Sequence, residues 1–267
     1  MIEISTADDS RLDAFRWRER QLTTIAQRKA ALNDGLFIAE GDLVVQRALE
    51  AGCLPDMVLC DPKRADLLGA QVERVGGKLF VASVDIRREV TGLGVPLDAI
   101  GLFHRPLILN PEELIETAER LVVLDCIDNP SNVGAIVRTA VALGWDGLLL
   151  DATSADPLSR RALRVSMGTA LKFRFARVND IASTLALLRD RGVTTIGLTP
   201  AESAINISNV ELDRLGRRAL VLGAERTGLS ESTLAQCSLH VNIPMSHGID
   251  SLNVAAAAAV ACYALGG

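Results

Sequence analysis

The chain has 267 residues, of which 49% are hydrophobic, 23% charged and only 3% aromatic, and its formal net charge is −5. This balance is typical of a globular protein that buries a core without disulfides or metals, and it excludes disorder as the main state. The acidic balance excludes a basic nucleic-acid coat, and the shortage of rings argues against stacking single-stranded bases. Any contact with nucleic acid must therefore come from local patches.

Apolar runs of strand length alternate with helical patterns along the chain. Strands are predicted at residues 36–39, 57–60, 79–82, 100–103, 121–125, 148–150, 194–198, 220–222 and 239–243. Helical patterns cover residues 42–51, 133–143, 181–191 and 251–265. This alternation predicts an α/β architecture with a largely parallel sheet. Arg105-Pro106 and Asn110-Pro111 interrupt it, so we predict two domains, residues 1–105 and 112–267.

Targeting and redox features favour a cytoplasmic protein. The N-terminus lacks the apolar core of a signal peptide, and the most apolar stretch, residues 254–265, is too short and Ala-rich to span a bilayer. The cysteines and the three histidines form no recognised ligand pattern, so we expect buried, reduced thiols and no metal site. The cysteines are Cys53, Cys60, Cys126, Cys237 and Cys262.

Positive charge is concentrated in two places. No acidic residue lies between Asp156 and Asp180, although six basic residues do, and an acid-free stretch in an acidic protein predicts an anionic partner. The first helical pattern is also rich in arginine, which a solvated helix face explains equally well. The candidate RNA contacts are Arg160, Arg161, Arg164, Lys172, Arg16 and Arg20.

Three segments of the second half follow strands and are polar. In the first, Asn132 is expected to cap the next helix, which contains Arg138. In the second, the strand leads to Gly223 and Glu225, and a glycine at a strand end lets a ligand approach the backbone. In the third, an edge strand is expected to stop at Pro244, and Ser251 or Asn253 opens an Ala-rich helix that suits a core or a subunit interface.

Each segment also has a plainer structural explanation, as a cap, a turn glycine or a close-packing helix. Generic nucleotide signatures are absent from the sequence. It contains no GxGxxG after a strand and no GxxxxGK[ST], which disfavours a nicotinamide oxidoreductase and a P-loop NTPase.

In this order the segments resemble motifs one, two and three of the SpoU (TrmH) family of RNA 2'-O-ribose methyltransferases in the SPOUT superfamily. The matching stretches are NPSNVGAIVRTA, LVLGAERTGLS and IPMSHGIDSLNV, and ADPLSRRALRVSMGTALKFRF resembles the family's middle segment. The resemblance covers roughly residues 118–267. The first hundred residues, with FIAEGDLVVQRALEAG, resemble the family's smaller substrate-binding domain, which is similar to a ribosomal protein fold.

The resemblance implies a C-terminal domain with a deep trefoil knot, S-adenosylmethionine bound in that knot, and a homodimer. Periodicity alone would not predict the knot, because knots are nearly absent from folds. Residues at the positions of the family's cofactor contacts are Gly223, Ile243, Leu252, Met245 and Thr199. Those at its catalytic and substrate-positioning sites are Asn132, Arg138, Glu225, Ser251 and Asn253. The chain departs from the family at Ala255, where serine is frequent and a hydrogen bond at the helix start is therefore in doubt.

The implied reaction moves a methyl group from a sulfonium to a ribose 2'-hydroxyl. The family account makes the motif-one arginine the base, but arginine keeps its proton in proteins. Our hypothesis is that Arg138 grips the phosphate and orients the hydroxyl, while the proton goes to the phosphate, to water or to a perturbed guanidinium. An RNA-binding or ribosome-assembly factor with little catalysis is the alternative. A separate N-terminal domain favours ribosomal over transfer RNA as substrate, and a resistance methyltransferase is one form this could take.

Overall fold

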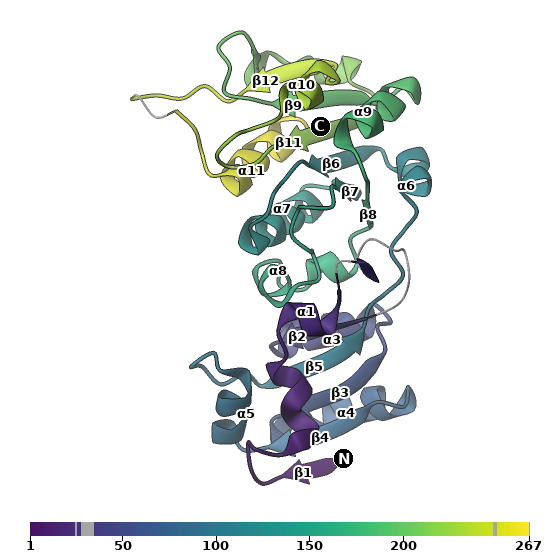
Figure 1. Ribbon diagram of the computed structural model, residues 1–267, viewed down its shortest axis with the longest axis vertical. Coiled ribbons are helices and arrows are strands. Elements are labelled where there is room, and N and C mark those ends of the chain that lie inside the picture. The colour runs from purple at the N-terminus through teal and green to yellow at the C-terminus, as the bar shows by residue number, and fades with distance from the viewer. Residues whose placement is uncertain (25, 28–34, 248–249, 267) are drawn as a thin grey trace. The chain divides into compact units, whose positions relative to one another are not determined.

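A computed structural model describes residues 1–24, 26–27, 35–247 and 250–266. The chain divides into two compact units (Figure 1). The N-terminal unit comprises Met1–Ile108 and Leu158–Lys172, and the C-terminal unit comprises Leu109–Pro157 and Phe173–Gly267. The first division falls in the expected Pro-rich linker. The segment Leu158–Lys172, which the sequence analysis placed in the second domain, instead joins the first unit.

The N-terminal unit is built on a mixed five-stranded sheet in the order β1-β4-β3-β5-β2, in which β5 is antiparallel to both neighbours. Its strands are β1 (Ile2–Ile4), β2 (Leu36–Glu40), β3 (Pro55–Cys60), β4 (Lys78–Ala82) and β5 (Ala99–His104). Its α-helices are α1 (Glu19–Leu22), α3 (Asp42–Glu50), α4 (Ala65–Arg74), α5 (Val84–Thr91) and α8 (Arg160–Val165). Three short 3-10 helices are η1 (Ser10–Arg16), η2 (Pro62–Arg64) and η3 (Thr169–Leu171).

The arginine-rich N-terminal pattern folds as η1 followed by the short α1. Asp9 caps η1 by accepting a hydrogen bond from the Arg11 N–H. Leu12 and Phe15 of η1 are fully buried in the core, so this segment covers the sheet, and the Arg11 guanidinium lies over the ring of Phe80 in β4, 5.6 Å from its centroid.

The C-terminal unit contains a seven-stranded, all-parallel sheet in the order β10-β12-β9-β11-β6-β7-β8. Its strands are β6 (Arg120–Leu124), β7 (Gly147–Leu150), β8 (Phe175–Arg177), β9 (Thr194–Leu198), β10 (Ile205–Asn206), β11 (Arg218–Leu222) and β12 (Leu239–Asn242). Its helices are α6 (Pro111–Thr117), α7 (Pro130–Ala142), α9 (Ile181–Asp190), α10 (Glu231–Ala235), α11 (Val254–Ala264) and the 3-10 turns η4 (Ile207–Asn209) and η5 (Leu212–Arg214).

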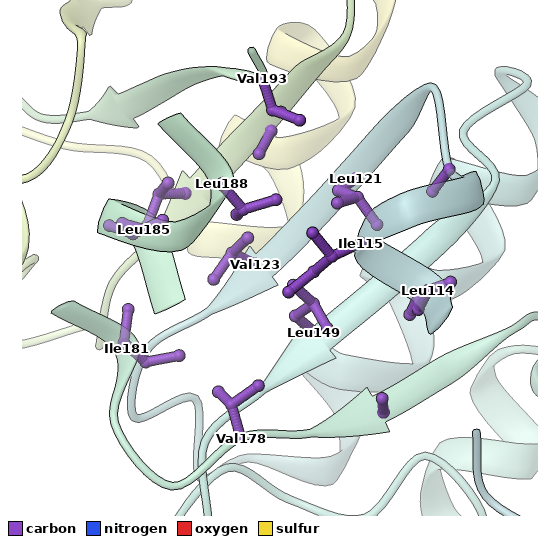
Figure 2. Close-up of a cluster of buried hydrophobic side chains, with 14 of the residues drawn as sticks. Leu114, Ile115, Leu121, Val123, Leu149, Val178, Ile181, Leu185, Leu188 and Val193 are labelled. Atoms are coloured by element: carbon purple, nitrogen blue, oxygen red, sulfur yellow. The ribbon is translucent and has the colours of Figure 1, made fainter. Parts of the chain in front are cut away.

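Helices cover both faces of this sheet, which is why its central strands are continuous apolar runs. Figure 2 shows one face, where side chains of α6 and α9 meet those of β6 and β7. The labelled residues there include Leu114, Ile115, Leu121, Val123, Leu149, Leu185 and Leu188. On the other face α11 packs against α7 (Figure 1). Because β12 lies beyond β9 and β11, the chain from β12 to α11 returns past the carboxyl ends of those strands.

Each strand expected from the sequence is present, whereas the short β1, β8 and β10 were not predicted. The prediction that Asn132 caps a helix is wrong. Asn129 is the cap, since its side chain accepts from the Ser131 N–H and Pro130 begins α7. The expected edge strand is also wrong, because β10 pairs with β12 on its outer side.

The five cysteines are free, but they are not all buried as expected. Cys53, Cys60 and Cys262 are buried, Cys237 is half-buried and Cys126 is exposed. In the described part of the chain, no helix combines the length and apolar character needed to cross a membrane.

Candidate active site

A cleft of about 740 Å³ lies at the carboxyl ends of three neighbouring parallel strands, β9, β11 and β12. Ligands of open α/β sheets bind in this position, because the loops after parallel strands gather at one edge. It is lined by Leu198, Thr199, Pro200 and Glu202, by residues 222–229 and 242–245, and by Asp250, Ser251, Leu252, Val254 and Ala257.

The cleft brings together every residue expected to contact the cofactor, namely Thr199, Gly223, Ile243, Met245 and Leu252. It also contains polar residues that sequence reasoning missed, among them Glu202, Arg226 and Asp250. The only sequence feature that could have identified these residues is their position in the loops that follow the strand ends. Nothing in the motifs distinguishes them from neighbouring loop residues.

Gly223 is required by its own loop. A Cβ there would lie 2.3 Å from the carbonyl carbon of Gly228 and 2.4 Å from the nitrogen of Leu229. The loop closes further through a hydrogen bond of 2.9 Å from the Gly228 N–H to the Ala224 carbonyl. Gly223 therefore shapes the wall of the cleft, and a larger residue would first collide with the backbone of that wall.

Three polar side chains from separate elements form a cluster with Glu225 at its centre. Glu225 follows β11 and lines the cleft, Asn132 lies in the first turn of α7, and Asn253 caps α11. The Asn132 amide donates to Glu225 Oε1, and Asn253 Nδ2 donates to the same oxygen at 2.8 Å and lies 3.2 Å from Asn132 Oδ1. Asn132 is only 6% exposed, so this contact defines its position.

Asn253 also supplies the hydrogen bond at the start of α11 that the absence of a serine at Ala255 had put in doubt. Its Oδ1 accepts the Ala255 N–H at 3.0 Å, so the start of α11 is capped without a serine side chain. Ser251 lines the cleft two residues before Asn253.

Arg138 is exposed on α7 and does not belong to this cluster. It follows Asn132 by six residues, which turns its side chain about 120° around the helix from that of Asn132. It shares a helix face with Val141, three residues further on, which is 38% exposed. The structure thus brings four of the five expected catalytic residues to one edge of the sheet and leaves the arginine on a different face.

Asp151 organises the neighbouring strand end. Its carboxylate, after β7, accepts the backbone N–H groups of Cys126, Thr153 and Ser154 at 3.1, 2.8 and 3.0 Å, and it also accepts the Thr153 and Ser154 hydroxyls. Burial raises the pKa of Asp151, but the hydrogen bonds from Ser154 and Thr153 outweigh it, so the pKa lies below its usual value. This ionised carboxylate fixes the loops after β6 and β7.

The basic residues expected to bind RNA have varied surroundings. Arg160 and Arg164 pair with Glu40. Lys172 pairs with Glu50 and Arg16 with Asp13, in both cases near the surface. Arg161 and Arg20 are exposed. Within the described ranges, no three histidine, cysteine, aspartate or glutamate side chains gather closely enough to hold a metal ion.

The family described as the SpoU rRNA Methylase family matches residues 119–263, more than half of the chain. The chain belongs to this family. The match spans the parallel sheet and all three loops of the cleft, and members of the family are RNA 2'-O-ribose methyltransferases.

Curated relatives of this SpoU methylase extend over the N-terminal unit as well. The protein named "Uncharacterized tRNA/rRNA methyltransferase Rv0881" from Mycobacterium tuberculosis is 35% identical over 98% of this chain and 90% of its own. The "23S rRNA (guanosine-2'-O-)-methyltransferase RlmB" of Acinetobacter baylyi is 32% identical over 76% of this chain and 84% of its own.

Among solved structures, the chain is similar to an AdoMet-bound rRNA methyltransferase from Sinorhizobium meliloti. The TM-score is 0.83 at 22% sequence identity, over 98% of this chain and 96% of that one. At this identity the likeness concerns the fold, and it includes both units.

Proposed function

We propose that this SpoU methylase transfers a methyl group from S-adenosylmethionine to a ribose 2'-hydroxyl of RNA, and that its substrate is ribosomal rather than transfer RNA. The proposal rests on one observation, which is that the polar cluster and the cleft have a residue in common. The Asn132–Glu225–Asn253 cluster shares Glu225 with a cleft whose lining includes each expected cofactor contact.

The cleft suits the proposed cofactor in size and chemistry. Its volume of about 740 Å³ lies within the usual range for small-molecule sites. Ile243, Met245 and Leu252 offer apolar surface for a purine ring, while Glu202 and Asp250 offer negative charge to a cationic sulfonium and ammonium group. When bound, S-adenosylmethionine supplies a methyl group already activated by the positive sulfur.

The side chains of the cluster have a positioning role in this reaction. The ribose oxygen must stand about 3–3.5 Å from the methyl carbon and in line with the bond that breaks. Asn132 and Asn253 hold Glu225 through one carboxylate oxygen, which leaves its other oxygen able to accept a hydrogen bond from the ribose. Ser251, on the cleft wall, supplies a hydroxyl for the same purpose.

We assign Arg138 to a phosphate beside the target ribose. Its exposure leaves the planar guanidinium available to a backbone phosphate, and a guanidinium, which keeps its proton in proteins, is a poor base. The proton of the hydroxyl then goes to the phosphate or to water.

We also propose a homodimer through the exposed face of α7 and α11. Val141 on α7 and Val260 and Tyr263 on α11 are 38%, 41% and 78% exposed, on two helices that pack together. A second copy would cover this apolar surface. Since Arg138 shares the Val141 face, dimerisation brings the arginine into the interface region and couples activity to assembly.

Two observations support ribosomal RNA as the substrate. The A. baylyi relative carries an rRNA methyltransferase name, and the larger part of the N-terminal unit, Met1–Ile108, lies outside the family match. We place the protein in the cytoplasm. All five cysteines are free, in keeping with a reducing compartment.

Calorimetric titration of the purified protein with S-adenosylmethionine, with NAD as control, tests the cofactor. Leu252→Lys should abolish saturable binding because it places a cation in the cleft, whereas the volume-conserving Leu252→Met should retain it. Transfer of labelled methyl to ribosomal but not transfer RNA, by a protein that light scattering finds dimeric, is the expected result. Tight cofactor binding with no transfer to any RNA would favour the assembly-factor alternative.

A further inference from the structure

The acid-free stretch of the sequence has an anionic partner within the N-terminal unit. The Glu40 side chain, at the end of β2, is only 1% exposed, and its two oxygens face Arg160 and Arg164 of α8. Arg160 Nη1 lies 3.5 Å from Oε1, and Arg164 Nη1 donates to Oε2. The arginines are four residues apart, so one face of α8 presents both to the same carboxylate.

Arg160 is held by further groups of the same unit. Its guanidinium donates to the carbonyls of Phe15, at 2.9 Å, and Trp17. Its backbone N–H, at the first position of α8, donates to Glu19 Oε1 at 2.9 Å. Elements from three parts of the N-terminal unit therefore fix the start of α8.

The end of the segment has a second set of contacts, with α3. Arg47 donates to the Met167 carbonyl at 2.6 Å. A Cβ on Gly168, whose φ is +79°, would lie 3.4 Å from Arg47 and Val44, so this turn lies directly on the helix. Lys172 pairs with Glu50 at 3.0 Å on the surface.

We infer that residues 158–172 form a strap, and that Glu40 is a positioning residue for the RNA substrate because it fastens this strap. The chain leaves the C-terminal unit after Pro157 and re-enters it at Phe173, so a strap fixed to the N-terminal unit links the two units at both of its ends, in addition to the linker at Ile108. Units joined by one linker move independently by default. Three covalent links limit that motion, and Glu40 anchors the one that enters the strap before α8, while α3 holds the other end of the strap.

The strap should affect catalysis through the effective concentration of the RNA at the cleft. This part of the inference rests on the proposed RNA methylation. An RNA held by the N-terminal unit presents its ribose to the cleft at a local concentration that depends on how firmly the units are linked. Releasing the strap lowers that concentration. It should raise the KM for RNA while sparing the cofactor affinity and the rate at saturating RNA.

Glu40→Gln tests this, with Glu50→Gln as the matched control on the same strap. In Glu40→Gln we expect the KM for RNA to rise about tenfold, with kcat and the Kd for S-adenosylmethionine within about twofold of wild type. Trypsin should cleave after the strap arginines about tenfold faster, as mass spectrometry of the fragments would show. Glu50→Gln should change neither quantity, because an exposed ion pair contributes little.

An unchanged tryptic pattern together with an unchanged KM in Glu40→Gln would overturn the inference, as would a fall in kcat alone. If that variant does not fold, Arg164→Gln decides by the rate of tryptic cleavage after Arg160 and Arg161, since Glu40 then keeps only Arg160. Should the wild-type protein methylate no RNA, the proposed function fails, whereas the tryptic comparison still tests the strap.

Discussion

Removing the amides that hold Glu225 should cost activity in a non-additive way. Asn132→Ala deletes one donor to Glu225 Oε1, and Asn253→Ser deletes the other while keeping an oxygen to cap α11. A hydrogen bond to a charged group contributes roughly 1.5–3 kcal/mol, so each single variant should lose about 10- to 150-fold in kcat/KM. Both donors act on one oxygen, so the double variant should lose less than the product, with a coupling of about 0.5–3 kcal/mol.

Initial rates of methyl transfer at several RNA concentrations would measure this cycle. Asn129→Ser is the control, because Asn129 caps the same helix and a serine preserves that cap, so wild-type rates are expected. Losses that multiply would show that the two asparagines act independently, and single variants with wild-type rates would refute the assignment of the cluster to catalysis.

Two further predictions concern stability. Gly223→Ala should destabilise the C-terminal unit by about 1–3 kcal/mol, because its Cβ would lie 2.3 Å from the Gly228 backbone, and it should also weaken cofactor binding. The control is Gly69→Ala, whose Cβ comes no closer than 3.4 Å to a Leu79 methyl. In the same calorimetric scans this control should neither lose stability nor bind the cofactor more weakly. The depressed pKa of Asp151 contributes stability above the unfolded-state pKa of about 3.9, which is lost as pH falls through the lower folded-state value. Urea unfolding between pH 2 and 7 should therefore show a smaller acid loss in Asp151→Asn, which is also less stable at neutral pH; equal pH profiles would contradict this role.

Much of the fold was predictable because its strands carry a strong local signal. The strands β6 and β11 are apolar runs, buried on both faces and bounded by turns. The missed strands β1, β8 and β10 have only three, three and two residues, and their pairing depends on neighbours distant in sequence. The cap of α7 was predictable from Asn129-Pro130, an N-cap followed by proline. Asn132, three residues further on, is of the same cap-forming type, and we expected the cap there instead.

The sequence was sufficient to predict which residues form the site, but only part of their spatial arrangement. The motifs named each of the side chains that meet at Glu225, because their types and order were in the sequence. They did not show that Arg138 points elsewhere on α7, which follows from its place in the helical turn. Charge counting predicted RNA as the anionic partner of Arg160 and Arg164, but nothing local could show that both also pair with Glu40, 120 and 124 residues earlier.

The strap also sets an order of events during synthesis. The core sheet of the N-terminal unit is complete once β5 has been made, yet Glu40 gains its two arginines only when α8 leaves the ribosome. At roughly 5–20 residues per second, several seconds separate the two. During that interval the Glu40 carboxylate lacks its two arginine partners. An unpaired carboxylate is more stable in water than in a protein interior, so Glu40 is expected to remain exposed to solvent. The N-terminal unit therefore finishes folding only after the first part of the C-terminal unit, Leu109–Pro157, has been made, and a translational pause before Arg160 would prolong that exposure.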